Sequence, residues 1–187
     1  EFYYAPPSGG FKSLCTANFD DPTIKPHEHF DVLTYTGSGS TRSITGLDFQ
    51  PDLVWIKDRT TGGSGGFHCI HDSVRGDDGT HKYILSSDNT ITTDTTYSGY
   101  GVTSFNSDGF SIINGGSLSN DSSRNYVAWN WKESASAGFD IVTYEGDSDT
   151  SGDTQSISHS LGVAPEMIIV KARDGRAAND YYARDYW

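Results

Sequence analysis

An acidic loop in the second half of the sequence has the spacing of a metal-binding segment. Oxygen-bearing side chains occupy four alternate positions, Asp147, Asp149, Ser151 and Asp153. Gly152 permits a sharp turn there, and Ca²⁺ binds oxygen ligands in flexible loops of this kind. An EF-hand would place its bidentate glutamate at Ser158, and no helical pattern flanks the loop. Two interpretations stay open, a Ca²⁺ site and a solvated acidic turn. We expect the chain to need no cofactor other than this candidate ion.

A second motif has the spacing of a serine nucleophile. The run 62–66 reads Gly-Gly-Ser-Gly-Gly and so fits Gly-x-Ser-x-Gly. That motif activates a serine only on a sharp turn between a strand and a helix. Here Ser64 is surrounded by glycines, and 67–70 is typical of a strand rather than a helix. The pattern favours a hairpin loop.

Two histidine groups could bind a metal. His27 and His29 would share one face of an extended chain. Of His68, Cys69 and His71, only the last two would share a face. Neither group provides a complete tetrahedral ligand set. We therefore expect linker or strand histidines, and no catalytic residue is predicted.

Composition and charge exclude several classes of protein. The 187 residues include 13 Lys and Arg against 25 Asp and Glu, giving a formal net charge of −12. Nucleic-acid binding needs a basic surface, and so does binding to an anionic membrane. No apolar run is long enough to cross a bilayer as a helix. Aromatic residues make up 13% of the chain, which indicates a folded core.

The sequence predicts that short strands position these residues. Alternating or apolar runs at 30–35, 53–57, 102–105, 110–113 and 126–131 are separated by clusters of Gly, Ser, Asn and Asp. Asp-Gly between the third and fourth runs predicts a tight hairpin. In the last run, Val127, Trp129 and Trp131 share one face, which we expect in the core. The sequence predicts an all-β protein, an antiparallel, jelly-roll-like β-sandwich.

The sequence also contains an internal repeat. The block 30–37 (Phe-Asp-Val-Leu-Thr-Tyr-Thr-Gly) returns at 139–146 as Phe-Asp-Ile-Val-Thr-Tyr-Glu-Gly. The block 51–59 (Pro-Asp-Leu-Val-Trp-Ile-Lys-Asp-Arg) returns at 165–173 as Pro-Glu-Met-Ile-Ile-Val-Lys-Ala-Arg. Apolar positions are kept while the acidic loop 147–153 lengthens the second copy, as expected of a duplicated β module.

The second copy is incomplete, because nothing in it corresponds to the later strands of the first. We expect three parts: the end of a preceding β domain and a linker at 1–27, a first β module at 28–135 and a partial second module at 136–187. Such a half module would leave strand edges uncovered, so further sequence or a neighbouring chain would have to complete it. Cys15 and Cys69 allow at most one disulfide, and their redox state stays open.

A further sequence pattern is formed by the stretches 30–37, 46–57, 72–76, 103–110 and 125–132. This pattern resembles a β-rich repeat domain common in virion proteins of marine tailed bacteriophages. The run 11–18 is similar to the end of a lectin-like, SPRY-type sandwich that often precedes that domain. The resemblance implies a non-enzymatic tail fibre or other surface appendage of a virion, in contact with other virion proteins. It implies no set of catalytic residues.

We expect this module to contribute to host attachment at the virion surface, outside the cell. A surface glycan is the favoured ligand, because exposed rings and Asn or Asp acceptors on loops suit sugars. The aromatic residues least tied to a strand pattern are the candidate ligand-binding residues, Tyr97, Tyr100, Tyr181 and Tyr182. A homo-oligomer is expected. Two alternatives stay open: a cellular carbohydrate-binding or adhesin domain, and a polysaccharide-degrading fibre enzyme.

Overall fold

The computed structural model describes residues 23–60, 68–75, 85–86, 101–113, 116–146 and 154–171. The described elements, in chain order, are a single 3₁₀ turn η2 (Pro26–Glu28), β1 (Phe30–Thr36), β2 (Arg42–Thr45), β3 (Leu53–Asp58), β4 (His68–Asp72), β5 (Leu85–Ser86), β6 (Val102–Asn106), β7 (Gly109–Ile112), the short helix α1 (Gly116–Ser119) and β8 (Asn125–Trp131).

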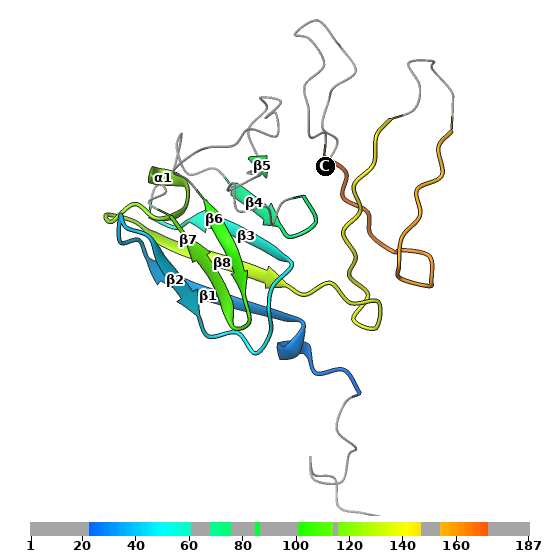
Figure 1. Ribbon diagram of the computed structural model, residues 1–187, viewed down its shortest axis with the longest axis horizontal. Helices are drawn as coiled ribbons and strands as arrows, with labels where there is room; N and C mark the ends of the chain where they lie inside the picture. The colour runs from blue at the N-terminus through cyan, green and yellow to red at the C-terminus, as the bar shows by residue number, and fades with distance from the viewer. Residues whose placement is uncertain are drawn as a thin grey trace, which may run out of the picture.

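The strands form two antiparallel sheets that stack face to face (Figure 1). One sheet has the order β1-β8-β3-β4-β5 and the other β2-β7-β6. The predicted all-β antiparallel sandwich is thereby confirmed. The first strand pairs with the last, β1 with β8, and the second pairs with the last but one, β2 with β7. This nested pairing is typical of a jelly roll. The order departs from it at β4, which pairs with its chain neighbour β3.

The core lies between the two sheets and is made of alternate residues from each strand. The fully buried apolar side chains include Val54 and Ile56 of β3, Phe110 of β7 and Tyr126 of β8. Tyr35 of β1 stacks on Tyr126, with ring centroids 5.3 Å apart. The burial of these apolar side chains is the main favourable contribution to the free energy of folding.

The β6–β7 hairpin follows the predicted turn with a small shift. Asn106 pairs with Gly109, so Ser107 and Asp108 form the tip. A Cβ on Gly109 would lie 2.0 Å from the carbonyl oxygen of Ile44 on the neighbouring strand β2. Glycine is therefore required at position 109 for the close approach of β2 to β7.

The prediction that Val127, Trp129 and Trp131 lie in the core is wrong. On β8 the buried residues are Tyr126, Ala128 and Asn130, and the three predicted residues are only partly buried on the outer side of the sheet. Asn130 stays inside because its side-chain amide donates to the carbonyls of Asp31 and Ala128. Both faces of β8 look apolar in sequence, so alternation alone did not tell inside from outside.

The second copy of the repeat lies outside both sheets. After β8 the chain turns at Gly138 and forms one isolated bridge, between Ser134 and Phe139. The described residues 140–146 and 154–171 form no strand, although their first-copy counterparts include β1 and β3. Figure 1 shows them leading away from the end of β8. In the first copy β1 and β3 each pair with β8, whereas the described residues of the second copy pair with no strand. The domain boundaries stay a prediction.

Candidate binding face

The outer side of the five-stranded sheet carries a row of aromatic side chains. Residues directly opposite each other in an antiparallel pair point to the same face. Trp129 lies opposite Val32 of β1 and Trp55 of β3, and Trp131 lies opposite Phe30 of β1. His68 of β4 continues the surface next to Trp55. We call the aromatic face the surface formed by Phe30, Trp55, His68, Trp129 and Trp131.

The rings of the aromatic face contact one another across three strands. The ring centroids of Phe30 and Trp131 are 5.0 Å apart. The ring centroid of Trp55 lies 5.9 Å from that of Trp129, with an interplanar angle of 67°, and 6.3 Å from that of Trp131. The pair Trp55–Trp129 has the edge-to-face arrangement that aromatic rings favour, and the other two pairs are tilted. The rings therefore support one another in fixed orientations.

The aromatic face is only partly covered. Phe30 is 38% exposed and Val32 beside it 40% exposed, and the three tryptophans are partly exposed. A contiguous apolar patch on a protein surface marks a site of interaction with a ligand or another protein.

A hydrogen bond fixes the edge of the aromatic face. The indole Nε1–H of Trp55 donates to Nδ1 of His68 at 2.8 Å, so that Nδ1 carries no proton. Burial, with the positive charge of Lys57 nearby, lowers the pKa of His68 below its usual value. The imidazole is therefore neutral at pH 7, and it holds the indole ring of Trp55 in place.

A largely polar row forms one border of the aromatic face. This row crosses four strands and consists of Thr34, Lys57 and His68, with the apolar Val127 between Thr34 and Lys57. The hydroxyl, ammonium and imidazole groups of this row can donate hydrogen bonds beside the exposed rings. An apolar platform with a polar border suits the face of a sugar ring, whose C–H groups stack on aromatic rings while its hydroxyls form hydrogen bonds at the side.

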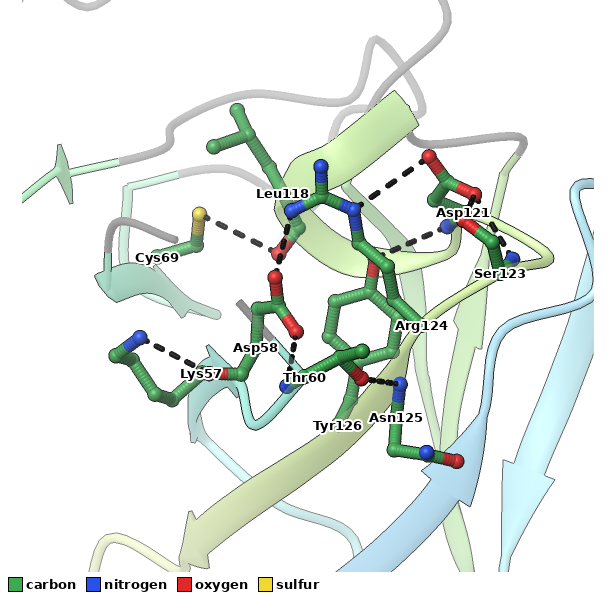
Figure 2. Close-up of polar contacts among 10 residues, drawn as sticks. All are labelled: Lys57, Asp58, Thr60, Cys69, Leu118, Asp121, Ser123, Arg124, Asn125 and Tyr126. Carbon is green, nitrogen blue, oxygen red and sulfur yellow. Dashed lines mark hydrogen bonds and ion pairs between the residues drawn. The ribbon is translucent and has the colours of Figure 1, made fainter. Parts of the chain in front are cut away.

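One end of the sandwich is held by a buried ion pair (Figure 2). Nη1 of Arg124 lies 2.6 Å from Oδ2 of Asp58, whose side chain is fully buried. The other oxygen of Asp58 accepts the backbone N–H of Thr60 at 2.7 Å. The pair connects the end of β3 to the loop that precedes β8, so the aromatic strand β8 enters the sheet at a fixed place.

The same loop is tied down by Asp121. Its backbone N–H donates to the hydroxyl oxygen of Tyr126 at 3.0 Å, and its carboxylate accepts the backbone N–H and hydroxyl of Ser123 (Figure 2). The two hydrogen bonds from Ser123 lower the pKa of this carboxyl below its usual value. Burial raises the pKa of Tyr126 to about 12, so its phenol stays neutral. We regard the network as support for the fold rather than a reactive site.

The candidate residues named from the sequence fall outside the described part of the chain. This applies to all eight: Tyr97, Tyr100, Tyr181, Tyr182, Asp147, Asp149, Ser151 and Asp153. Ser64 and its glycines lie outside it too. The glycan-binding tyrosines and the Ca²⁺ loop stay predictions.

The histidine groups are placed in part as expected. His27 belongs to η2 and is not extended, so the geometry proposed for it with His29 is wrong; the proline at the start of this turn favours helical φ. Cys69 and His71 do share the inner face, whereas His68 points outward. The thiol of Cys69 is free and its pKa is raised to about 12 by burial. Among the described residues, no three His, Cys, Asp or Glu side chains are grouped to bind a metal.

One family model matches the sequence, over residues 25–184, and its description is Domain of unknown function (DUF7483). The chain belongs to this family. Neither a curated protein nor a solved structure matches it. The DUF7483 match begins before β1 and runs through both copies of the repeat, so the segments outside the sheets belong to the same family domain as the sandwich. In the described residues of this DUF7483 domain, no helix is long and apolar enough to cross a membrane.

Sequence reasoning missed the aromatic face because it assigned these rings to the core. A signal was present: in β8 a partly polar set, Tyr126, Ala128 and Asn130, alternates with an apolar set, Val127, Trp129 and Trp131. Either set could face inward in a strand that is apolar on both sides. In this DUF7483 domain the set with Tyr126 faces inward, because Phe110 of the facing sheet lies in the core with Tyr126 and contacts Tyr35.

Proposed function

We propose that this domain is a non-enzymatic attachment module of a bacteriophage virion, part of a tail fibre or other surface appendage, and that its aromatic face binds a host-surface glycan. The observation that carries the glycan part is the partly exposed row of rings Phe30, Trp131, Trp55 and Trp129 on the outer side of the sheet. The virion part rests on the resemblance of the sequence pattern to phage virion domains.

The physical case for glycan binding is preorganisation. Each ring of the aromatic face is held by a neighbouring ring, and Trp55 also by the hydrogen bond to His68. A ligand that stacks on these rings therefore orders few side chains on binding, which lowers the entropic cost of association. Such a site binds sugars without chemistry, since stacking and hydrogen bonding need no nucleophile.

A glycan array followed by titration calorimetry tests this function. We expect binding to one class of bacterial surface glycan, and Trp129→Ala should weaken it by roughly tenfold or more. The matched control is Tyr144→Ala, which removes an exposed ring that is not on the aromatic face. Unchanged affinity in Trp129→Ala, with the fold intact by circular dichroism, would refute the proposed site.

A second assay separates this function from its alternatives. Incubating the protein with the bound glycan and measuring reducing ends should show no product release. Product release would favour the polysaccharide-degrading fibre enzyme instead. Capsid and tail genes beside the coding sequence support the virion assignment, and their absence would favour a cellular adhesin.

A further inference from the structure

One hydrogen bond of the aromatic face depends on the protonation state of a histidine. Trp55 of β3 and His68 of β4 are diagonal neighbours on the outer side of the sheet, because Lys57 lies opposite His68 and Trp55 comes two residues before Lys57. The indole Nε1–H of Trp55 donates to Nδ1 of His68 at 2.8 Å, and the two ring centroids are 5.5 Å apart. An indole N–H is a donor only, so this bond needs an unprotonated nitrogen on His68.

Protonation of His68 removes that acceptor. A neutral imidazole has one accepting nitrogen, whereas the imidazolium ion donates at both nitrogens. Rotation of the charged ring therefore offers Trp55 no acceptor in any orientation. With the rings in their present places, two N–H groups would face each other across 2.8 Å, so one of the two side chains has to move.

The indole of Trp55 lies between His68 and the rings of β8. Its ring centroid is 5.9 Å from that of Trp129 and 6.3 Å from that of Trp131. An indole that has lost its hydrogen bond takes up more orientations, and it has to be ordered again when a ligand stacks on the rings. Loss of the bond at His68 therefore weakens binding at the centre of the aromatic face.

We infer that the aromatic face is a pH-regulated binding site, in which protonation of His68 releases the indole of Trp55 and weakens glycan binding. The inference rests on the proposed glycan binding and adds the regulation of that same site. His68 acts as a positioning residue, because its effect on the ligand passes through Trp55. By linkage, bound glycan favours the neutral form of His68 as much as the neutral form favours bound glycan.

The charged groups around His68 place the change on the acid side of neutrality. Among the described residues, Lys57 is the charged group directly opposite His68. Burial and, to a smaller extent, the positive charge of Lys57 lower the pKa of His68 below its usual value of about 6.5. Asp58 points to the inner side of the sheet, where it pairs with Arg124. The affinity should therefore be highest at neutral pH and should decline below about pH 6.5.

The other elements beside His68 add little charge. Cys69 points inward, and its thiol is neutral because burial raises its pKa to about 12. Neither β5 nor α1, which both contact β4, contains an ionisable residue, and the same is true of the sequence 61–67 before β4. His71 stays neutral in the folded protein, because burial lowers its pKa to about 3.

An NMR titration of the ligand-free protein from about pH 7.5 to about pH 5 is the first measurement. We expect the indole N–H signal of Trp55 to shift with the same midpoint as the ring signals of His68. Circular dichroism at each pH checks that the protein remains folded. A Trp55 signal that does not follow the titration of His68 overturns the inference.

Calorimetry with the glycan selected on the array is the second measurement. One pH unit below the midpoint of His68, the affinity should be roughly fivefold lower than at neutral pH. His68→Phe keeps a ring but has no acceptor for Trp55, so its affinity at neutral pH should already be reduced and should not change with pH. The matched control is His27→Gln, which removes an exposed histidine outside the aromatic face and should keep the pH dependence.

The two measurements separate this inference from the proposed function. Glycan binding that is equally tight at neutral and acid pH, or a pH dependence that persists in His68→Phe, overturns the inference and leaves the proposed function in place. A common midpoint for Trp55 and His68 in a protein that binds no glycan at any pH refutes the proposed function, and with it the regulation of glycan binding.

Discussion

The ring of Phe139 stacks on that of Trp131, with centroids 6.2 Å apart and planes inclined by 25°. Phe30, the equivalent residue of the first repeat, contacts Trp131 from β1 at 5.0 Å. One tryptophan of β8 therefore receives the first residue of both repeats. This contact connects the sandwich to the start of the second copy of the repeat.

Replacing Phe139 should loosen that connection without unfolding the sandwich. Phe139→Ala removes a ring pair of roughly 1 kcal/mol from a residue that lies outside both sheets. We expect faster hydrogen exchange at residues 139–141 and a nearly unchanged urea midpoint. Phe30→Ala is the control, and it should lower the midpoint because Phe30 belongs to a paired strand. Equal effects of the two variants on the midpoint would contradict this account.

The buried ion pair predicts an asymmetric mutational effect. Arg124→Met leaves the buried carboxylate of Asp58 without its guanidinium, so we expect a clear loss in the free energy of unfolding. Asp58→Asn removes the buried charge and keeps an oxygen that accepts the N–H of Thr60, so it should cost less. Urea denaturation of both variants measures the difference. A smaller loss of unfolding free energy in Arg124→Met than in Asp58→Asn would refute the predicted asymmetry.

Acid should destabilise the fold through His71. This imidazole is fully buried, and desolvation, with a smaller effect of Arg75, lowers its pKa to about 3. The unfolded chain has a histidine pKa of about 6.5, so it binds the proton first as the pH falls. The stability contributed by neutral His71 is complete above that pH and declines below it, by roughly 2 kcal/mol between about pH 6.5 and pH 5.

Urea midpoints across that interval measure the decline. Burial raises the pKa of Glu133, which acts in the opposite direction, so the contribution of His71 is read from the difference between two proteins. The lowered pKa of His68 acts in the same direction as that of His71. In a His71→Leu variant the slope should be smaller than in the unmodified protein. An identical slope in the two proteins would show that His71 is not the cause.

The hairpin glycine predicts a contrast between two Gly→Ala substitutions. At Gly109 the new Cβ would lie 2.0 Å from the carbonyl oxygen of Ile44, so we expect a cost of about 3 kcal/mol or more. At Gly138 the φ is also positive, but nothing lies within 4 Å of the Cβ position. That substitution should cost only about 1 kcal/mol from backbone strain. Thermal denaturation measures the loss of stability in the two variants. Equal losses in Gly109→Ala and Gly138→Ala would contradict the claim that close packing requires glycine at position 109.

The strands could be predicted because their signals are local. The run at 30–35 and the hairpin around Asp108 have alternation and turn residues that act within a few positions, and the structure has strands at both places. The pairing of β1 with β8 joins residues far apart in the sequence, and no local pattern specifies it.

The site could not be predicted in the same way. The sequence predicts Trp129 and Trp131 in the core, because aromatic side chains usually bury more area than Ala128 and Asn130 do. In the structure the inner space is filled by Tyr126 with Phe110, which leaves the tryptophans on the outer side. Which face of a strand is inside depends on the facing sheet, and this becomes visible only in three dimensions.

The most direct test of the central claim is a titration of isotopically labelled protein with the glycan selected on the array, followed by NMR of the indole N–H signals. The account predicts that the signals of Trp55, Trp129 and Trp131 shift together with one dissociation constant, while the backbone amides of Asp121 and Ser123 stay in place. Shifts confined to other parts of the chain, with the three indoles unaffected, would contradict the claim that the aromatic face binds the ligand.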